Sequence, residues 1–257
     1  MLPALFVSHG SPNLIGEDTP AREFLAGLGA SLGRPSAIVV ASAHWETAVP
    51  ELTAAAQPET IHDFYGFPEP LYRLRYPAPG NPGLAAWAAA LLEGAGIQAA
   101  TEARRGLDHG AWSPLLLMYP KADIPVVELS VQHGQSPAHH IAVGRALAPL
   151  RHDNVLVMGS GGAVHNLRML ERGRPGDPVA WARDFDEWLD TQLGEGDDAA
   201  LAAYRREAPG AVQAHPRDEH LLPVFVAYGA GGPGARGRRI HDSFTYGSLS
   251  MAAFLFQ

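Results

Sequence analysis

Short, largely apolar segments that end abruptly in small or polar residues constrain the fold of this chain most. Each is too short for a buried helix and lacks strict alternation, which is typical of strands buried on both faces of a sheet. The segments are residues 4–7, 37–40, 124–131 and 155–158. Helical patterns separate them, so the order predicts an α/β fold whose central, mostly parallel or mixed sheet has helices on both faces.

Helices are expected between these strands, and the first of them begins with residues that are typical of helix N-termini. Thr19 is a capping residue, and Pro20 suits the first helical position. The expected helices cover residues 19–32, 83–92, 113–118, 137–150 and 178–193, and a further short strand is expected at 97–101. A length of 257 residues without an internal repeat or linker predicts one domain over residues 1–257.

Composition excludes several kinds of site and partner. The chain has no cysteine, so a metal must be held by His, Asp or Glu, and thiolate sites and disulfides are excluded. The net charge of −8, without a basic stripe, argues against nucleic acid as a partner. No apolar segment is long enough to span a membrane, and the N-terminus lacks a signal peptide pattern, so no membrane partner and a cytoplasmic location are expected.

Five histidines stand out because they lie in Gly-, Pro- or Ser-rich contexts without periodicity: His9, His44, His109, His165 and His220. Most of them lie near the ends of apolar segments, and the carboxyl ends of parallel strands meet in one crevice. A neutral imidazole there is well placed to bind a metal. The other histidines adjoin charges or lie in helical patterns, and His139 and His140 are expected at the surface.

Two further segments have alternative interpretations. Residues 61–79, rich in proline and aromatic residues, form either a surface loop packed by its own rings or a pocket wall. In the second case His62, Asp63 and the aromatic residues after them would flank a flat ligand. Residues 159–162 (GSGG) match neither a phosphate loop nor a nucleophile elbow, and we expect them to let the backbone approach a ligand that His165 faces.

Eight short motifs then follow one another along the chain. They are SHGSP (8–12), SAHW (42–45), HDFYGFP (62–68), YPAPG (76–80), DHGAW (108–112), VHNLR (164–168), EHLLP (219–223) and YGSLSM (246–251). Together they resemble the class III extradiol ring-cleavage dioxygenases, and most closely the branch named for DOPA 4,5-dioxygenase. This resemblance implies a single α/β catalytic domain and a mononuclear, non-haem divalent metal.

The resemblance also implies roles for the five histidines. His9, His44 and His220 match the metal ligands of this branch. His165 matches an active-site histidine that is either a ligand or an acid/base. His109 matches a further active-site histidine, which would donate a hydrogen bond to superoxide or to a developing oxyanion. The wider class uses two histidines and a carboxylate, so Glu219, next to His220, is an alternative ligand. His215, which begins the same loop, is a second alternative to His220.

Neighbouring side chains are expected to support these histidines or the substrate. Asp108 would orient His109, whereas Ser42 and Asn166 would support nearby residues. Trp45 and Tyr65 would form walls against an aromatic ring.

The implied reaction is the opening of a catechol ring by O2 to give a semialdehyde. Three ligands on one face leave Fe(II) open positions, and the cation lowers the pKa of a bound phenol. His165 would take a ring proton and later return one. Zn(II) fits the same ligands, so a zinc hydrolase of small amides or esters and a non-catalytic metal- or aromatic-ligand-binding protein are alternatives. A homo-oligomer is compatible with the sequence.

Overall fold

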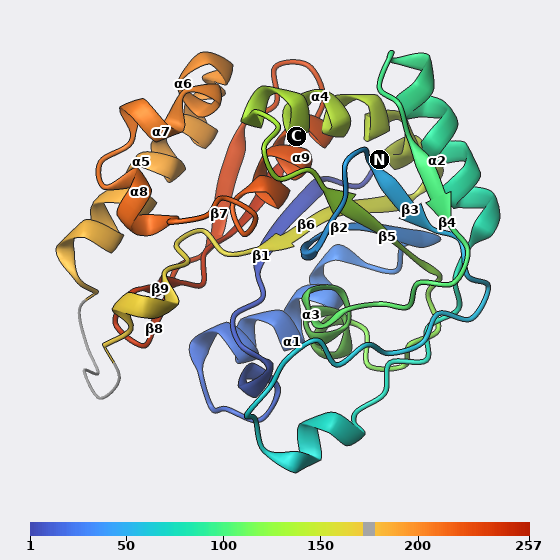
Figure 1. Ribbon diagram of the computed structural model, residues 1–257, viewed down its shortest axis with the longest axis horizontal. Helices are drawn as coiled ribbons and strands as arrows, with labels where there is room; N and C mark the ends of the chain where they lie inside the picture. Colours follow the sequence, from blue (N-terminus) through green and yellow to red (C-terminus); the bar gives the residue numbers. More distant parts are fainter. Residues whose placement is uncertain (172–177) are drawn as a thin grey trace.

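The computed structural model describes residues 1–171 and 178–257, which fold around a mixed eight-stranded sheet (Figure 1). The strand order is β4-β3-β5-β2-β6-β1-β10-β7. The central strands β5, β2, β6 and β1 are parallel, whereas β10 and β7 add an antiparallel edge. The strands are β1 Ala4–Ser8, β2 Ala37–Glu46, β3 Glu51–Thr53, β4 Ala100–Glu102, β5 Val126–Val131, β6 Val155–Gly161, β7 Gly237–His241 and β10 Ala253–Phe256, with β8 Phe244–Thr245 and β9 Leu249–Ser250 as a separate pair.

Helices cover both faces of this sheet, as predicted. One face packs against α2 Pro82–Gly94, α4 Pro137–Leu147, α5 Ala180–Glu195 and α9 Leu222–Ala230. The other face packs against α1 Pro20–Leu32 and α3 His109–Met118. Alternate residues of β1 supply the two cores, because successive strand side chains point to opposite faces: Phe6 belongs to the first core and Val7 to the second.

The remaining helices are short. Between α5 and α9 lie α6 Asp198–Ala202, α7 Tyr204–Glu207 and α8 Ala211–Ala214. The 3-10 helices are η1 Pro12–Ile15, η2 Glu69–Arg73, η3 Ala148–Asp153 and η4 Leu167–Met169. In the described part of the chain, no helix combines the length and the apolar character that a membrane crossing requires.

Two predicted element boundaries next to histidines are wrong. Strand β2 continues to Glu46 through a register shift against β5, so His44 lies within the strand and not after it. Helix α3 begins at His109 and not at residue 113, because the Asp108 side chain accepts a hydrogen bond from the Ala111 N–H and caps the helix. The predicted 137–150 helix ends at Leu147 and continues as η3, which contains a proline in its first turn.

Candidate metal centre

The carboxyl ends of three neighbouring strands bring the predicted histidines together. Strand β6 lies between β1 and β2, with Gly161 opposite Ser8 and Ser160 opposite Ser42. His9 directly follows β1, and its backbone N–H donates to the Gly161 carbonyl at 3.0 Å. Parallel strands therefore end at one edge of the sheet, where an α/β fold gathers its site.

His220 reaches this edge from the segment before α9, and glycines in β6 make room for it. A Cβ on Gly161 would lie 2.1 Å from the His220 carbonyl oxygen, and a Cβ on Gly159 would lie 2.1 Å from that of Pro223. The Gly162 N–H donates to the His220 oxygen at 2.8 Å. The prediction that these glycines admit a ligand is therefore wrong for Gly159 and Gly161, which admit protein backbone.

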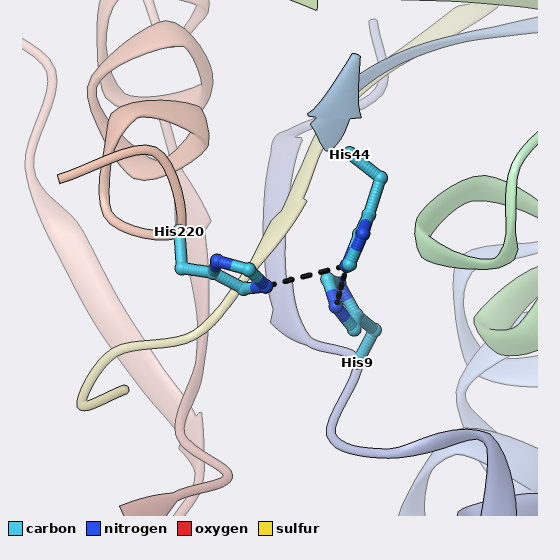
Figure 2. A group of neighbouring side chains, drawn as sticks. All are labelled: His9, His44 and His220. Carbon is cyan, nitrogen blue, oxygen red and sulfur yellow. Dashed lines mark hydrogen bonds between the residues drawn. The ribbon is translucent and has the colours of Figure 1, made fainter. Parts of the chain in front are cut away.

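The rings of His9, His44 and His220 point toward one another (Figure 2). The Nε2 atom of His44 lies 3.1 Å from Nε2 of His9 and 3.2 Å from Nε2 of His220. His9 and His220 are buried, and His44 is partly exposed. This triad of ring nitrogens, one from each histidine, is arranged so that it could hold one metal ion.

The second ring nitrogen of each histidine in the triad faces an oxygen. Nδ1 of His9 lies 3.0 Å from Ser160 Oγ, which itself donates to the Gly110 carbonyl at 2.5 Å and therefore accepts from His9. Nδ1 of His44 lies 3.2 Å from Asp63 Oδ2. Nδ1 of His220 lies 3.0 Å from Glu219 Oε1. Since ionised carboxylates only accept, each Nδ1 carries the hydrogen.

When all three rings are neutral, the triad presents three nitrogen lone pairs to one another. Burial lowers the pKa of His44, but the hydrogen bond to Asp63 and the charges of nearby carboxylates together outweigh burial and raise this pKa, so His44 takes up a proton more readily than His9 or His220. Burial, followed by repulsion from the other histidines, lowers the pKa of His9 and of His220 well below the usual range, so both rings are neutral. Buried acceptors that face only each other are unfavourable unless a cation lies between them. Neutral imidazoles whose other nitrogen donates to an oxygen are typical ligands of divalent transition metals.

His109 and His165 lie beside the triad. The first residue of α3, His109, donates to Asp63 Oδ1 from both Nδ1 and its backbone N–H, each at 2.9 Å, and its ring centroid is 4.0 Å from that of His44. His165 stacks on His220 with centroids 3.5 Å apart and planes within 8° of parallel. Burial lowers the pKa of His165 to about 4, and burial also lowers the pKa of His109.

The two alternatives to His220 are engaged elsewhere. His215 is fully buried, and its Nε2 bonds to the Ala163 carbonyl at 2.9 Å while its ring packs against Phe185. Glu219 lies next to the triad, but its carboxylate takes the His220 Nδ1–H and is held by Arg217 at 3.2 Å.

A cavity of about 330 Å³ opens on the triad. The histidines that line it are His44, His109, His165 and His220. Its other walls are mainly apolar, with Phe64, Tyr65, Phe67, Leu167, Leu170 and Leu249. Of the two interpretations of residues 61–79, the pocket wall is therefore confirmed. The volume and the apolar lining suit a small aromatic ligand.

Several supporting residues differ from prediction. Asp63 was expected only to flank a ligand, but its carboxylate contacts Nδ1 of His44 and of His109. No pattern in the surrounding sequence indicated that role. His62 bonds to the Leu74 carbonyl and does not line the cavity. Asp108 bonds to Ser42 at 2.6 Å and does not bond to the His109 ring, whereas Ser42 accepts from the His44 N–H, as expected of a supporting residue.

The expected positions of Trp45 and His140 are wrong, whereas Asn166 supports neighbouring residues as expected. Trp45 is buried under Arg105 and does not line the cavity, unlike Tyr65. The Asn166 side chain caps η4 and donates to the Gln213 carbonyl. His140 is completely buried, because its Nε2 accepts from the Gln132 N–H and its Nδ1 bonds to the Ser136 carbonyl.

Comparison with known families assigns the chain to one of them. The sequence model described as "Catalytic LigB subunit of aromatic ring-opening dioxygenase" matches residues 4–256. The chain belongs to this family. Its members are metal-dependent ring-opening dioxygenases, which take a small aromatic molecule and O2, so the predicted class of enzyme is confirmed.

Individual relatives agree with this assignment over almost their whole length. The "4,5-DOPA dioxygenase extradiol" of Beta vulgaris is 44% identical, covering 98% of this chain and 95% of the relative. The protein of the same name from Escherichia coli K12 is 42% identical, covering 89% and 85%. The crystal structure of an uncharacterized protein from Escherichia coli K12 superposes with a TM-score of 0.82 at 35% identity, covering 99% of both chains.

Proposed function

We propose that this protein cleaves the ring of a catechol at the bond next to the diol. Both atoms of O2 enter the product, a ring-opened semialdehyde acid, while the ring carbons are oxidised and O2 is reduced. The observation that carries this proposal is the convergence of three Nε2 atoms, with that of His44 3.1 and 3.2 Å from those of His9 and His220, beside a largely apolar cavity. The names of the relatives support a DOPA-like or other dihydroxy-aromatic substrate.

The proposed metal ligands are His9, His44 and His220, around one divalent ion. Fe(II) is the ion that this chemistry requires, because when bound it acidifies the catechol hydroxyl and supplies an electron-rich centre for O2. Zn(II) would occupy the same nitrogens without supporting oxidation. The alternatives His215 and Glu219 are less suitable, since Nε2 of His215 bonds to the Ala163 carbonyl and the Glu219 carboxylate bonds to Arg217 and to Nδ1 of His220.

His165 is proposed as an acid/base and not as a fourth ligand. The lone pair of an imidazole lies in the plane of its ring, and the His165 plane is stacked on that of His220, with centroids 3.5 Å apart. An ion held by the lone pair of His220 would therefore not meet the lone pair of His165. The ring makes no hydrogen bond within the described residues, and with its pKa lowered to about 4 it is neutral and free to accept a catechol proton.

His109 is proposed to act on developing negative charge. Because its Nδ1–H is donated to Asp63, the neutral ring offers only a lone pair at Nε2. A hydrogen bond from His109 to an oxyanion therefore requires that Nε2 first takes a proton. The Asp63 carboxylate, 2.9 Å away, stabilises the resulting imidazolium.

The decisive experiment is reconstitution with Fe(II) under nitrogen. A panel comprising catechol, 4-methylcatechol and L-DOPA is then added, and oxygen is admitted. We expect a yellow ring-opened product that contains both atoms of ¹⁸O2. If no member of the panel consumes oxygen, the proposal is wrong.

Variants separate this proposal from its alternatives. His9→Ala and His44→Ala should abolish metal binding, whereas His165→Ala should keep metal and catechol affinity but lose turnover. A zinc hydrolase would instead cleave amides or esters with Zn(II) and without oxygen, and a binding protein would show no turnover to lose. The single catalytic domain over residues 1–257, the cytoplasmic location and the homo-oligomer remain predictions.

A further inference from the structure

One carboxylate, that of Asp63, is shared by two histidines from different elements. Its Oδ2 lies 3.2 Å from Nδ1 of His44 in β2. Its Oδ1 lies 2.9 Å from Nδ1 of His109 and 2.9 Å from the His109 backbone N–H at the start of α3. The side chain is 24% exposed and lines the same cavity as His44 and His109.

We propose that Asp63 is a positioning residue that sets the tautomers of His44 and His109 together. Because an ionised carboxylate only accepts hydrogen bonds, it holds the hydrogen of both rings on Nδ1. In the neutral rings, Nε2 of His44 is thereby left unprotonated toward the triad, and Nε2 of His109 is left unprotonated beside it. The inference rests on the proposed function only in taking His44 as a metal ligand.

The two carboxylate oxygens are not equivalent, and this makes the inference testable. Oδ1 accepts from a backbone N–H, which cannot reverse its polarity, whereas Oδ2 accepts only from a ring that has a second tautomer. In Asp63→Asn the amide oxygen should therefore take the Oδ1 place and keep both bonds from His109. The amide NH2 would then face His44 Nδ1, donor against donor, and drive His44 to its Nε2–H tautomer.

The expected order of metal affinity differs from that of a merely structural residue. Asp63→Asn should lower Zn(II) affinity roughly ten- to a hundredfold, the range seen when the partner of a ligating histidine is removed. Asp63→Ala should lower it less, because it removes the acceptor without presenting a donor. If Asp63 only filled space, the isosteric asparagine would be the milder change.

The experiment measures Zn(II) affinity of the full-length protein by competition with a chromophoric chelator. Ring ¹⁵N shifts of the metal-free protein report the tautomers directly, and His44 should move from Nδ1–H to Nε2–H only in Asp63→Asn. Asp218→Asn is the matched control, because Asp218 bonds to Nδ1 of His133 at 2.8 Å, outside the triad. It should leave both readouts unchanged.

Two results would overturn the inference: wild-type Zn(II) affinity in Asp63→Asn, or a His44 ring that keeps its Nδ1–H there. If Asp63→Asn does not fold, wild-type affinity in Asp63→Ala overturns it instead. Its failure is distinguishable from that of the proposed function. A wild-type protein that binds metal but cleaves no catechol contradicts the proposed function alone, whereas active Asp63→Asn with unchanged metal affinity contradicts this inference alone.

Discussion

Gly161→Ala should weaken metal binding by displacing His220. Gly161 is the last residue of β6, and its α-carbon packs directly against the backbone of His220. A Cβ there would lie 2.1 Å from the His220 carbonyl oxygen and 3.1 Å from its carbonyl carbon. No side-chain rotation relieves such a contact, because the backbone fixes the position of the Cβ and both atoms that it meets belong to the His220 backbone.

The size of the effect follows from the distance that must open. Contacts of a Cβ below 3.0 Å are essentially absent from real proteins, so the His220 carbonyl must move by about 1 Å. Overpacking of this kind costs about 1–3 kcal/mol, or roughly 3–10 °C in Tm for a chain of this length. Because the movement carries a ring whose Nε2 lies 3.2 Å from that of His44, we expect Zn(II) affinity to fall by at least about tenfold.

A matched variant separates the local effect from general destabilisation. A Cβ on Gly144 would lie 2.0 Å from the Val226 carbonyl oxygen, in the contact between α4 and α9 and away from the triad. Gly144→Ala should therefore lower Tm by a similar amount and leave Zn(II) affinity unchanged. Gly27→Ala, with nothing within 4 Å, should lower neither.

Chelator competition gives the affinities, and thermal unfolding of the metal-free proteins gives the stabilities. Equal Zn(II) affinities in Gly161→Ala and Gly144→Ala would refute the claim that β6 positions His220. A Gly161→Ala protein as stable as wild type would refute the backbone clash itself.

Two further predictions concern the cavity mouth and a buried histidine. Tyr65 lines the cavity yet is 89% exposed, so Tyr65→Ala should raise KM for catechols a few-fold and leave Tm unchanged. Val212→Ala, at an exposed position outside the cavity lining, should change neither KM nor Tm. An unchanged KM in Tyr65→Ala would contradict this prediction. Burial lowers the pKa of His140 from 6.5 to about 4, so below pH 6.5 the unfolded chain takes up a proton that the folded chain does not. The free energy of unfolding of the wild type should therefore fall between pH 6.5 and 4. Measured by urea unfolding, the difference in this free energy between wild type and His140→Gln should shrink by about 3 kcal/mol over that range. A difference that stays constant would contradict the prediction.

The sequence alone determined the architecture and the family. Strands buried on both faces must be short and apolar, and helices must bury one side, so the order of these patterns limits the chain to an α/β sheet. His9 and His165 were recognisable because a histidine just beyond a buried strand, among glycines, has no role in the core. The eight motifs in order then pointed to the extradiol dioxygenases.

Only the tertiary structure decided which ring nitrogen each histidine presents, and to what. That choice depends on the partner of the other nitrogen, and those partners are remote in sequence: Ser160 for His9, Asp63 for His109. The same reason explains why His140 is buried and why His215 turns away from the triad. Hydrogen-bond partners on separate loops and strands leave no local pattern, because a side-chain contact depends on position in space and not on spacing along the chain.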